Sequence, residues 1–152
     1  MEERLLPVGL QSFEGIRTEG YVYVDKTDLI QGMIKYYKYV FLSRPRRFGK
    51  SLLSDTLQCY FEGRKELFEG LKIADTERDW IKYPVIKLDM SLYKEEDPET
   101  LKKSLSNLMC KYERKFSIEK YDDTPGNKLA NLIEEINEKT GLKTVVILDE
   151  YD

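Results

Sequence analysis

Histidine is absent from the 152-residue chain. This absence excludes a catalytic triad built on imidazole and every zinc site that takes histidine ligands. Cysteine occurs only twice, at Cys59 and Cys110, which is too few for a zinc site of four cysteines. We expect both cysteines to be buried apolar residues in a reducing compartment.

Long apolar runs are lacking as well. No stretch approaches the roughly 20 apolar residues of a membrane-spanning helix, and the start "MEERLLPVGL" lacks the features of a signal peptide. A net charge of −3 gives no general attraction to nucleic acid. We therefore expect a cytoplasmic protein with no membrane partner, whose contact with nucleic acid, if it has one, is indirect or local.

What is present indicates one globular domain, because 152 residues suffice for a single core and a composition of 41% hydrophobic and 35% charged residues is typical of soluble folded chains. The spacing of apolar residues predicts helices over 25–38, 51–62 and 97–116, and from 129 to about 141. A short helix followed by a turn is predicted in each of the segments 65–73 and 75–83. Apolar runs predict strands over 39–43, 84–91 and 144–152, with 21–24 either a short strand or an extended segment. Because helices alternate with strands that are apolar on both faces, we predict an α/β fold with a mainly parallel sheet between two helical layers.

The segment "RPRRFGKS", residues 44–51, lies between a predicted strand and a predicted helix. A phosphate-binding loop, GxxxxGK[ST], has this context. Gly49 allows the backbone to approach the phosphates, Lys50 offsets their charge, and the Ser51 hydroxyl holds magnesium. Arg44 stands where the first glycine usually is, at a cost of about 1 kcal/mol if that position needs a positive φ.

We predict that the whole loop contacts the nucleotide, with these residues: Arg44, Pro45, Arg46, Arg47, Phe48, Gly49, Lys50, Ser51 and Leu52. Arg46 and Arg47 have open roles. They either contact the phosphates directly or reach the nucleotide of a neighbouring subunit. Alternatively they form a solvated basic turn or a patch for the DNA backbone.

The predicted last strand ends in two acids, as "VVILDE" over 145–150. Four apolar residues followed by two acids are the Walker B pattern. Asp149 is the predicted magnesium ligand, together with Ser51, and Glu150 is predicted to orient and activate the attacking water. The catalytic residues that we predict are therefore Glu150 and Lys50.

These motifs resemble those of the AAA-ATPase-like proteins found widely in bacteria, in which the loop itself reads "RPRRFGKS". The resemblance extends over 6–30, 60–73, 80–91 and 145–152. It implies an ASCE-type P-loop fold and ATP with Mg²⁺ as ligands. It also implies a C-terminal partner domain related to PD-(D/E)xK nucleases. Arg44 is then a trait of the family.

The segment "YVDKT", residues 23–27, is also typical of the family. Asp25, Lys26 and Thr27 either lie near the adenine or cap the helix that follows. Asp89, at the end of a predicted strand, is a further candidate for the ligand crevice, because ligands of open α/β sheets bind beyond the carboxyl ends of the strands.

We interpret 1–152 as the N-terminal part of an AAA-ATPase-like P-loop domain, with a segment ahead of the loop at 1–38 and a core at 39–152. In ASCE folds, a strand that follows Walker B lies between the Walker B strand and the P-loop strand, and a lid comes later. We expect this chain to be a fragment without them, which exposes strand edges, self-associates and has weak or no ATPase activity alone.

The function that we predict is Mg-dependent ATP binding, with hydrolysis that powers or regulates the nuclease-like domain. A nucleotide sensor with little turnover is an alternative that the sequence does not separate from it. A nucleic-acid-binding module is a third candidate, supported by the basic loop and by eleven tyrosines and opposed by the net acidic charge.

Overall fold

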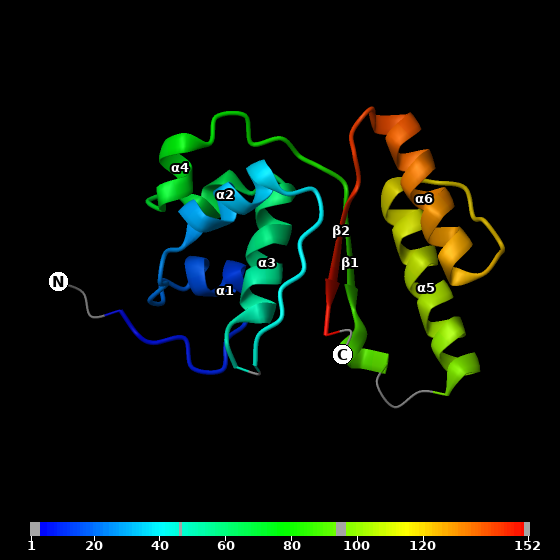
Figure 1. Cartoon of the computed structure of the whole chain (residues 1–152), viewed down its shortest axis with the longest axis horizontal. Helices are drawn as coiled ribbons and strands as arrows, with labels where there is room; N and C mark the ends of the chain where they lie inside the picture. Colours follow the sequence, from blue (N-terminus) through cyan, green and yellow to red (C-terminus); the bar gives the residue numbers. More distant parts are fainter. Residues whose placement is uncertain (1–3, 46, 94–96, 151–152) are drawn as a thin grey trace. The chain divides into compact units, whose positions relative to one another are not determined.

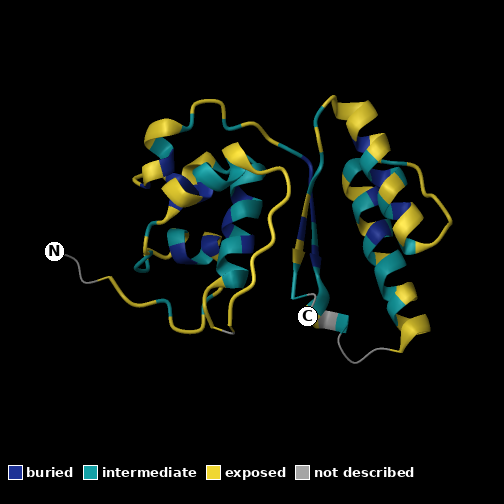
Figure 2. Cartoon of the chain, viewed as in Figure 1, coloured by how far each residue is buried: buried dark blue, intermediate teal, exposed yellow. Residues whose placement is uncertain are grey.

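The computed structural model describes residues 4–45, 47–93 and 97–150. The chain divides into two compact units, Met1–Lys82 and Tyr83–Asp152. Figure 1 shows the elements of each, and Figure 2 shows how far each residue is buried. The predicted organisation as a single domain with segments 1–38 and 39–152 stays a prediction.

The first unit is helical over its described residues. Its elements are α1 (Phe13–Thr18), α2 (Thr27–Tyr36), α3 (Lys50–Phe61), the 3₁₀ helix η1 (Lys65–Phe68) and α4 (Lys72–Thr76). The predicted helices over 25–38 and 51–62 are confirmed. Their core contains six buried residues from four of these elements and the turn before α4: Phe13, Cys59, Leu67, Phe68, Leu71 and Ile73.

The predicted strand over 39–43 is wrong: the structure has no strand there. The segment has no regular secondary structure and lies at the surface, where the side chain of Tyr39 is 83% exposed and that of Phe41 is 72% exposed. A strand needs a hydrogen-bonded neighbouring strand, and the described residues of this unit form no strand that could pair with the segment. The segment 21–24 is likewise not a strand, which leaves the alternative of an extended segment.

The short helix predicted within 75–83 is also wrong, because α4 ends at Thr76. The Glu77 carboxylate accepts hydrogen bonds from the backbone N–H groups of Arg78 and Asp79, at 3.0 and 3.2 Å. Trp80 then has a positive φ of 42°. Its ring packs on Phe68 in the core, with the centroids 5.1 Å apart. Local acceptors and the burial of one large ring thus end the helix early.

The second unit combines a parallel strand pair with two long helices. Its elements are β1 (Val85–Asp89), the 3₁₀ helix η2 (Met90–Tyr93), α5 (Pro98–Phe116), α6 (Pro125–Thr140) and β2 (Val145–Asp149). The strands pair in parallel, from Val85 opposite Val145 to Asp89 opposite Asp149. The α/β character and the parallel sheet are therefore confirmed, with two strands among the described residues.

The helices of this unit begin and end at recognisable signals. Asp97 accepts hydrogen bonds from the N–H groups of Glu99 and Thr100, with Pro98 in the first turn of α5. Gly141 ends α6 with a φ of 69°. The predicted start and stop signals are confirmed. Between the helices and β1 lies a core of Ile86, Leu88, Met109, Leu132 and Ile136.

Candidate functional site

The loop that the sequence identifies lies at the surface of the first unit. Arg44, Pro45, Arg47, Phe48 and Gly49 are exposed, and the next three residues, Lys50, Ser51 and Leu52, are half-buried at the start of α3. Arg46 lies outside the described residues. The loop is therefore open to solvent at the place where a phosphate group would approach.

The loop backbone makes its sharp turn later than the sequence suggests. Arg44 is not among the residues with positive φ, so the expected strain at the first position is not found. Arg47 and Gly49 have positive φ instead, at 65° and 73°. The left-handed conformation costs a residue with a side chain about 1 kcal/mol. Among the described loop residues that carry a side chain, this cost therefore falls on Arg47, close to the predicted phosphate-binding residues Lys50 and Ser51.

Three of the described α-helices, α2, α3 and α4, have no hydrogen bond to an N-cap side chain, and α3 differs from the other two because no described side chain elsewhere accepts from its first backbone N–H groups. The other α-helices that the structure describes each receive a side-chain oxygen at their first backbone N–H groups. The acceptors are Ser12 for α1, Asp25 for α2 and α4, Asp97 for α5 and Thr124 for α6. The described part of the chain offers no side-chain cap for α3, which follows Gly49.

An uncapped helix N-terminus has N–H groups without an intrahelical partner and a partial positive charge. Both properties favour an anion, and the adjacent Lys50 ammonium adds a full charge. The residues present therefore fit a phosphate group at the start of α3.

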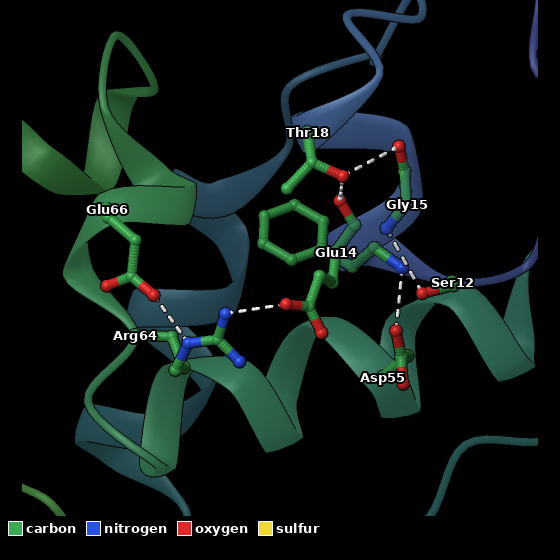
Figure 3. A network of polar contacts seen from close by, with 8 residues as sticks. Ser12, Glu14, Gly15, Thr18, Asp55, Arg64 and Glu66 are labelled. Atoms are coloured by element: carbon green, nitrogen blue, oxygen red, sulfur yellow. Dashed lines mark hydrogen bonds and ion pairs between the residues drawn. The ribbon is translucent and has the colours of Figure 1, made fainter.

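The N-terminal segment contacts helix α3 through hydrogen bonds and an ion pair. The backbone N–H of Phe13 donates to the Asp55 Oδ2 at 2.6 Å, which ties the start of α1 to the middle of α3. Figure 3 shows this bond and a second link beyond the end of α3, where Arg64 lies between Glu14 and Glu66, at 2.7 and 2.5 Å. The hydrogen bonds to Glu14 and Glu66 raise the pKa of Arg64. These contacts fix the helix that carries Lys50 and Ser51.

Sequence reasoning did not identify Asp55 or Arg64. Their partners are 42 and 50 residues away in the chain, at Phe13 and Glu14. No local pattern marks such a pairing. The one nearby signal is Ser12, a good N-cap residue, which accepts from the N–H of Gly15 at 3.2 Å.

The "YVDKT" segment has a capping role. The Asp25 Oδ1 accepts from the Thr27 N–H at 2.9 Å and from the Thr27 hydroxyl at 2.7 Å, while its Oδ2 accepts from the Lys72 N–H at 2.8 Å. Thr27 is fully buried, and its Oγ1 also accepts from the Ile73 N–H at 3.1 Å. Burial alone would raise the pKa of Asp25, but the hydrogen bonds from Thr27 and Lys72 outweigh it and lower the pKa. Asp25 and Thr27 thus join the starts of α2 and α4, and Lys26 lies at the N-cap of α2.

The acidic pair lies in the second unit, at the carboxyl end of β2. Asp149 is the last residue of the strand, and Glu150 follows with a positive φ of 53°. Asp89 ends β1 and stands in register with Asp149. The Asp89 Oδ1 accepts from the N–H and the hydroxyl of Ser91, at 3.0 and 2.6 Å. Two strand ends therefore bring carboxylates to one edge of the sheet, as expected for a ligand site of a parallel sheet.

The predicted site residues are thus divided between the units, with Lys50 and Ser51 in the first and Asp149 and Glu150 in the second. Within the described ranges, no group of three or more acidic or cysteine side chains is arranged to hold a metal. A magnesium ion at this protein would therefore take part of its coordination from phosphate oxygens and water, as this ion commonly does.

A family model described as "Predicted AAA-ATPase" matches residues 7–152, which is nearly the whole chain. The chain belongs to this AAA-ATPase-like family. Membership agrees with the resemblance that the loop and the acidic strand end carry, and it implies nucleotide binding in broad terms.

One curated relative in the comparison is an "Uncharacterized protein in vnfD 5'region" of Azotobacter chroococcum mcd 1. It is 36% identical over 154 residues, an alignment that covers 100% of this chain and 30% of the relative. The chain therefore spans under a third of the length of this relative. No solved structure gives a significant match to this AAA-ATPase-like chain. Over the described ranges, the chain has no helix with both the length and the apolar character needed to cross a membrane.

Proposed function

We propose that this AAA-ATPase-like chain binds ATP with Mg²⁺ and contributes to its hydrolysis. The observation that carries the proposal is the start of α3, where Lys50 and Ser51 follow a left-handed Gly49 and no described side chain caps the helix. Family membership supports a nucleotide as the anion.

Each residue has a role that its chemistry suits. The N–H groups at the start of α3 bind the phosphates, and the Lys50 ammonium offsets the charge on the outer ones. The Ser51 hydroxyl and the Asp149 carboxylate are the side chains that would hold magnesium, and the ion would supply further positive charge near the transferring phosphate. The Glu150 carboxylate orients the attacking water and accepts its proton. Asp89, in register with Asp149, is a second carboxylate at the same sheet edge.

The proposal extends to a partner. Hydrolysis would power or regulate a nuclease-like domain, as the family resemblance implies, and the greater length of the curated relative leaves room for a further domain in a protein of this type. Self-association of the chain is part of the same proposal. It is supported by apolar side chains at the surface, among them Tyr39, Phe41, Val146 and Leu148.

Calorimetric titration with Mg-ATP tests nucleotide binding. We expect the unmodified chain to bind, Lys50→Ala to lose at least tenfold in affinity, and Lys38→Ala to change it less than threefold. Lys38 is a matched control because it is an exposed lysine of the first unit that lies outside the loop. Equal affinity of Lys50→Ala and the unmodified chain would refute the assignment of the site.

Turnover separates an ATPase from a nucleotide sensor. In Glu150→Gln we expect ATP binding to persist while phosphate release falls by about 100-fold or more, because the general base is lost. If the unmodified chain and the Glu150→Gln variant both bind ATP and release phosphate at the same slow rate, the protein acts as a nucleotide sensor.

The exposure of Arg44 and Arg47 gives the nucleic-acid alternative its support. If the loop binds a DNA backbone, the double variant Arg46→Ala/Arg47→Ala loses salt-dependent DNA binding and keeps ATP binding.

A further inference from the structure

A continuous exposed stretch connects the end of α2 to the start of α3 in the first unit. Every described residue over 35–49 is exposed, and Figure 2 shows this stretch in yellow. We call residues 35–48 the aromatic tract, because five aromatic residues lie on it. Each of them is between 63% and 83% exposed: Tyr36, Tyr37, Tyr39, Phe41 and Phe48. Apolar side chains that are exposed next to one another mark interaction surfaces.

The charge of the same stretch has one sign. Residues 29–54 contain six basic side chains and none of the chain's 28 acidic residues. Arg46 lies outside the described residues. The other five take part in no ion pair within the described ranges: Lys35, Lys38, Arg44, Arg47 and Lys50. The tract is therefore a local positive region on a chain whose net charge is −3.

Two lysines of the tract lie over aromatic rings. The Lys35 Nζ is 5.6 Å from the centroid of the Tyr36 ring, and the Lys38 Nζ is 5.2 Å from the centroid of the Tyr39 ring. An ammonium group is attracted to the face of an aromatic ring at this distance. Each pair therefore presents a positive charge and a flat ring side by side at the surface.

The combination of charge and rings distinguishes between possible partners. An apolar protein surface, or a second copy of this acidic chain, would cover the rings but has no anionic row to pair with the cations. A nucleic-acid duplex would pair with the cations, but its bases are already stacked on one another. A single strand uses both features, because its phosphates pair with basic side chains and its bases stack on aromatic rings.

We propose that the aromatic tract binds single-stranded nucleic acid. Its basic side chains neutralise phosphates, and bases stack on the exposed rings of Tyr36, Tyr37 and Tyr39. Lys50, which we assign to the ATP site, is outside the tract. The proposal therefore does not depend on the proposed function, and a chain of this kind can hold both ligands.

The measurement is the fluorescence anisotropy of a labelled oligothymidine of about 20 nucleotides, titrated with the full chain at several salt concentrations. We expect binding whose logarithm falls with the logarithm of salt with a slope of about −3, since the tract has four described cations and each phosphate contact on a single strand contributes about 0.7. A duplex of the same length should bind at least tenfold more weakly. Oligouridine compares RNA with DNA, and the tighter of the two is assigned as the ligand.

The double variant Tyr37→Leu/Tyr39→Leu tests stacking, because leucine keeps an exposed apolar side chain and removes the flat ring. We expect affinity for oligothymidine to fall at least tenfold while the salt slope stays unchanged. Tyr121→Leu is the matched control, since Tyr121 is an exposed tyrosine of the second unit. It should change the affinity less than threefold.

The double variant Lys35→Ala/Lys38→Ala tests the charge. We expect the magnitude of the salt slope to fall by about 1, because two phosphate contacts are lost. Lys111→Ala/Lys120→Ala removes two exposed lysines of the second unit, and it should leave the slope unchanged. Equal slopes in the two lysine variants would overturn the proposal.

The competing explanation is that the rings serve self-association. In that case Tyr37→Leu/Tyr39→Leu changes the oligomeric state in sedimentation velocity and leaves oligonucleotide affinity unchanged, which would overturn the proposal. Lys50→Ala separates the tract from the ATP site. We expect it to bind the oligonucleotide normally, and loss of that binding would overturn the proposal by placing the strand in the ATP site. Loss of the proposed ATP binding alone would leave the tract unaffected.

Discussion

The Thr27 hydroxyl is a sensitive point of the first unit, and we expect Thr27→Val to destabilise it strongly. The side chain is fully buried, and its oxygen accepts from the Ile73 N–H at 3.1 Å while donating to Asp25 at 2.7 Å. Valine has nearly the same shape but neither function. It leaves the buried Ile73 N–H without an acceptor, at about 1–3 kcal/mol, and removes a charge-assisted bond of about 1.5–3 kcal/mol. Both bonds are made by the same hydroxyl, so their contributions do not add in full, and we expect the free energy of unfolding to fall by about 2–4 kcal/mol.

Thr27→Ser is the informative comparison, because it keeps the hydroxyl and removes only a methyl group. Burial of one such group contributes about 0.8 kcal/mol, so the serine variant should lose about 1 kcal/mol. Thr18→Val is the exposed control. The Thr18 hydroxyl bonds to the Glu14 carbonyl within its own helix, and its loss should cost less than about 0.5 kcal/mol.

Urea unfolding followed by tryptophan fluorescence measures these differences. The chain has one tryptophan, Trp80, and it packs on the core of the first unit. With a slope of about 1–3 kcal/mol per molar urea, the valine variant should lower the midpoint by about 1 M or more. A midpoint no lower than that of Thr18→Val, or a serine variant less stable than the valine variant, would show that the buried hydroxyl does not hold α2 to α4.

Two further predictions concern the same unit and use the same fluorescence assay. Gly63→Ala should destabilise by at least about 1 kcal/mol more than Gly49→Ala: both have positive φ, but only at Gly63 would the new Cβ meet a backbone atom, the Trp80 oxygen, at 2.9 Å. Equal midpoints would contradict this. Asp25→Asn should be less stable than the unmodified chain at pH 5–7, and the gap should close as the pH falls below about 4. The folded state lowers the pKa of Asp25, so its contribution is present above the unfolded pKa and is lost as the carboxylate takes up a proton. A gap that persists in acid would contradict the role of the charge.

The elements that the sequence predicted well are those whose signals are local. The start of α5 depends on Asp97 and Pro98, which lie within one turn of the groups they affect. The end of α6 at Gly141 is equally local. The loop residues Gly49, Lys50 and Ser51 form a contiguous pattern, so the candidate site could be read directly. In each case the residues that determine the feature lie next to it in the sequence, so no distant contact is needed to predict it.

The predictions that failed depended on distant contacts. Trp80 ends a helical pattern because its ring packs on Phe68. The sequence around residue 80 contains no signal from which this contact could be predicted. The partly exposed Cys110 follows from the packing of α5 on α6, which brings Lys128 to its sulfur. The Asp55 contact with Phe13 likewise has no signature in either segment.

The segment 39–43 shows why an apolar run predicts burial better than it predicts a strand. Strand propensity measures how well side chains fit a half-buried pleated surface. It therefore indicates that the segment would pair with a neighbouring strand, but it does not identify that strand. Here Tyr39 and Phe41 are largely exposed. Helix α3, which begins at Lys50, forms nonetheless, because its hydrogen bonds are local and Asp55 ties it to α1. The left-handed turn at Gly49 and the start of α3, which we propose as the phosphate site, therefore depend on the helix and its contacts with the N-terminal segment, and they form without the predicted strand ahead of them.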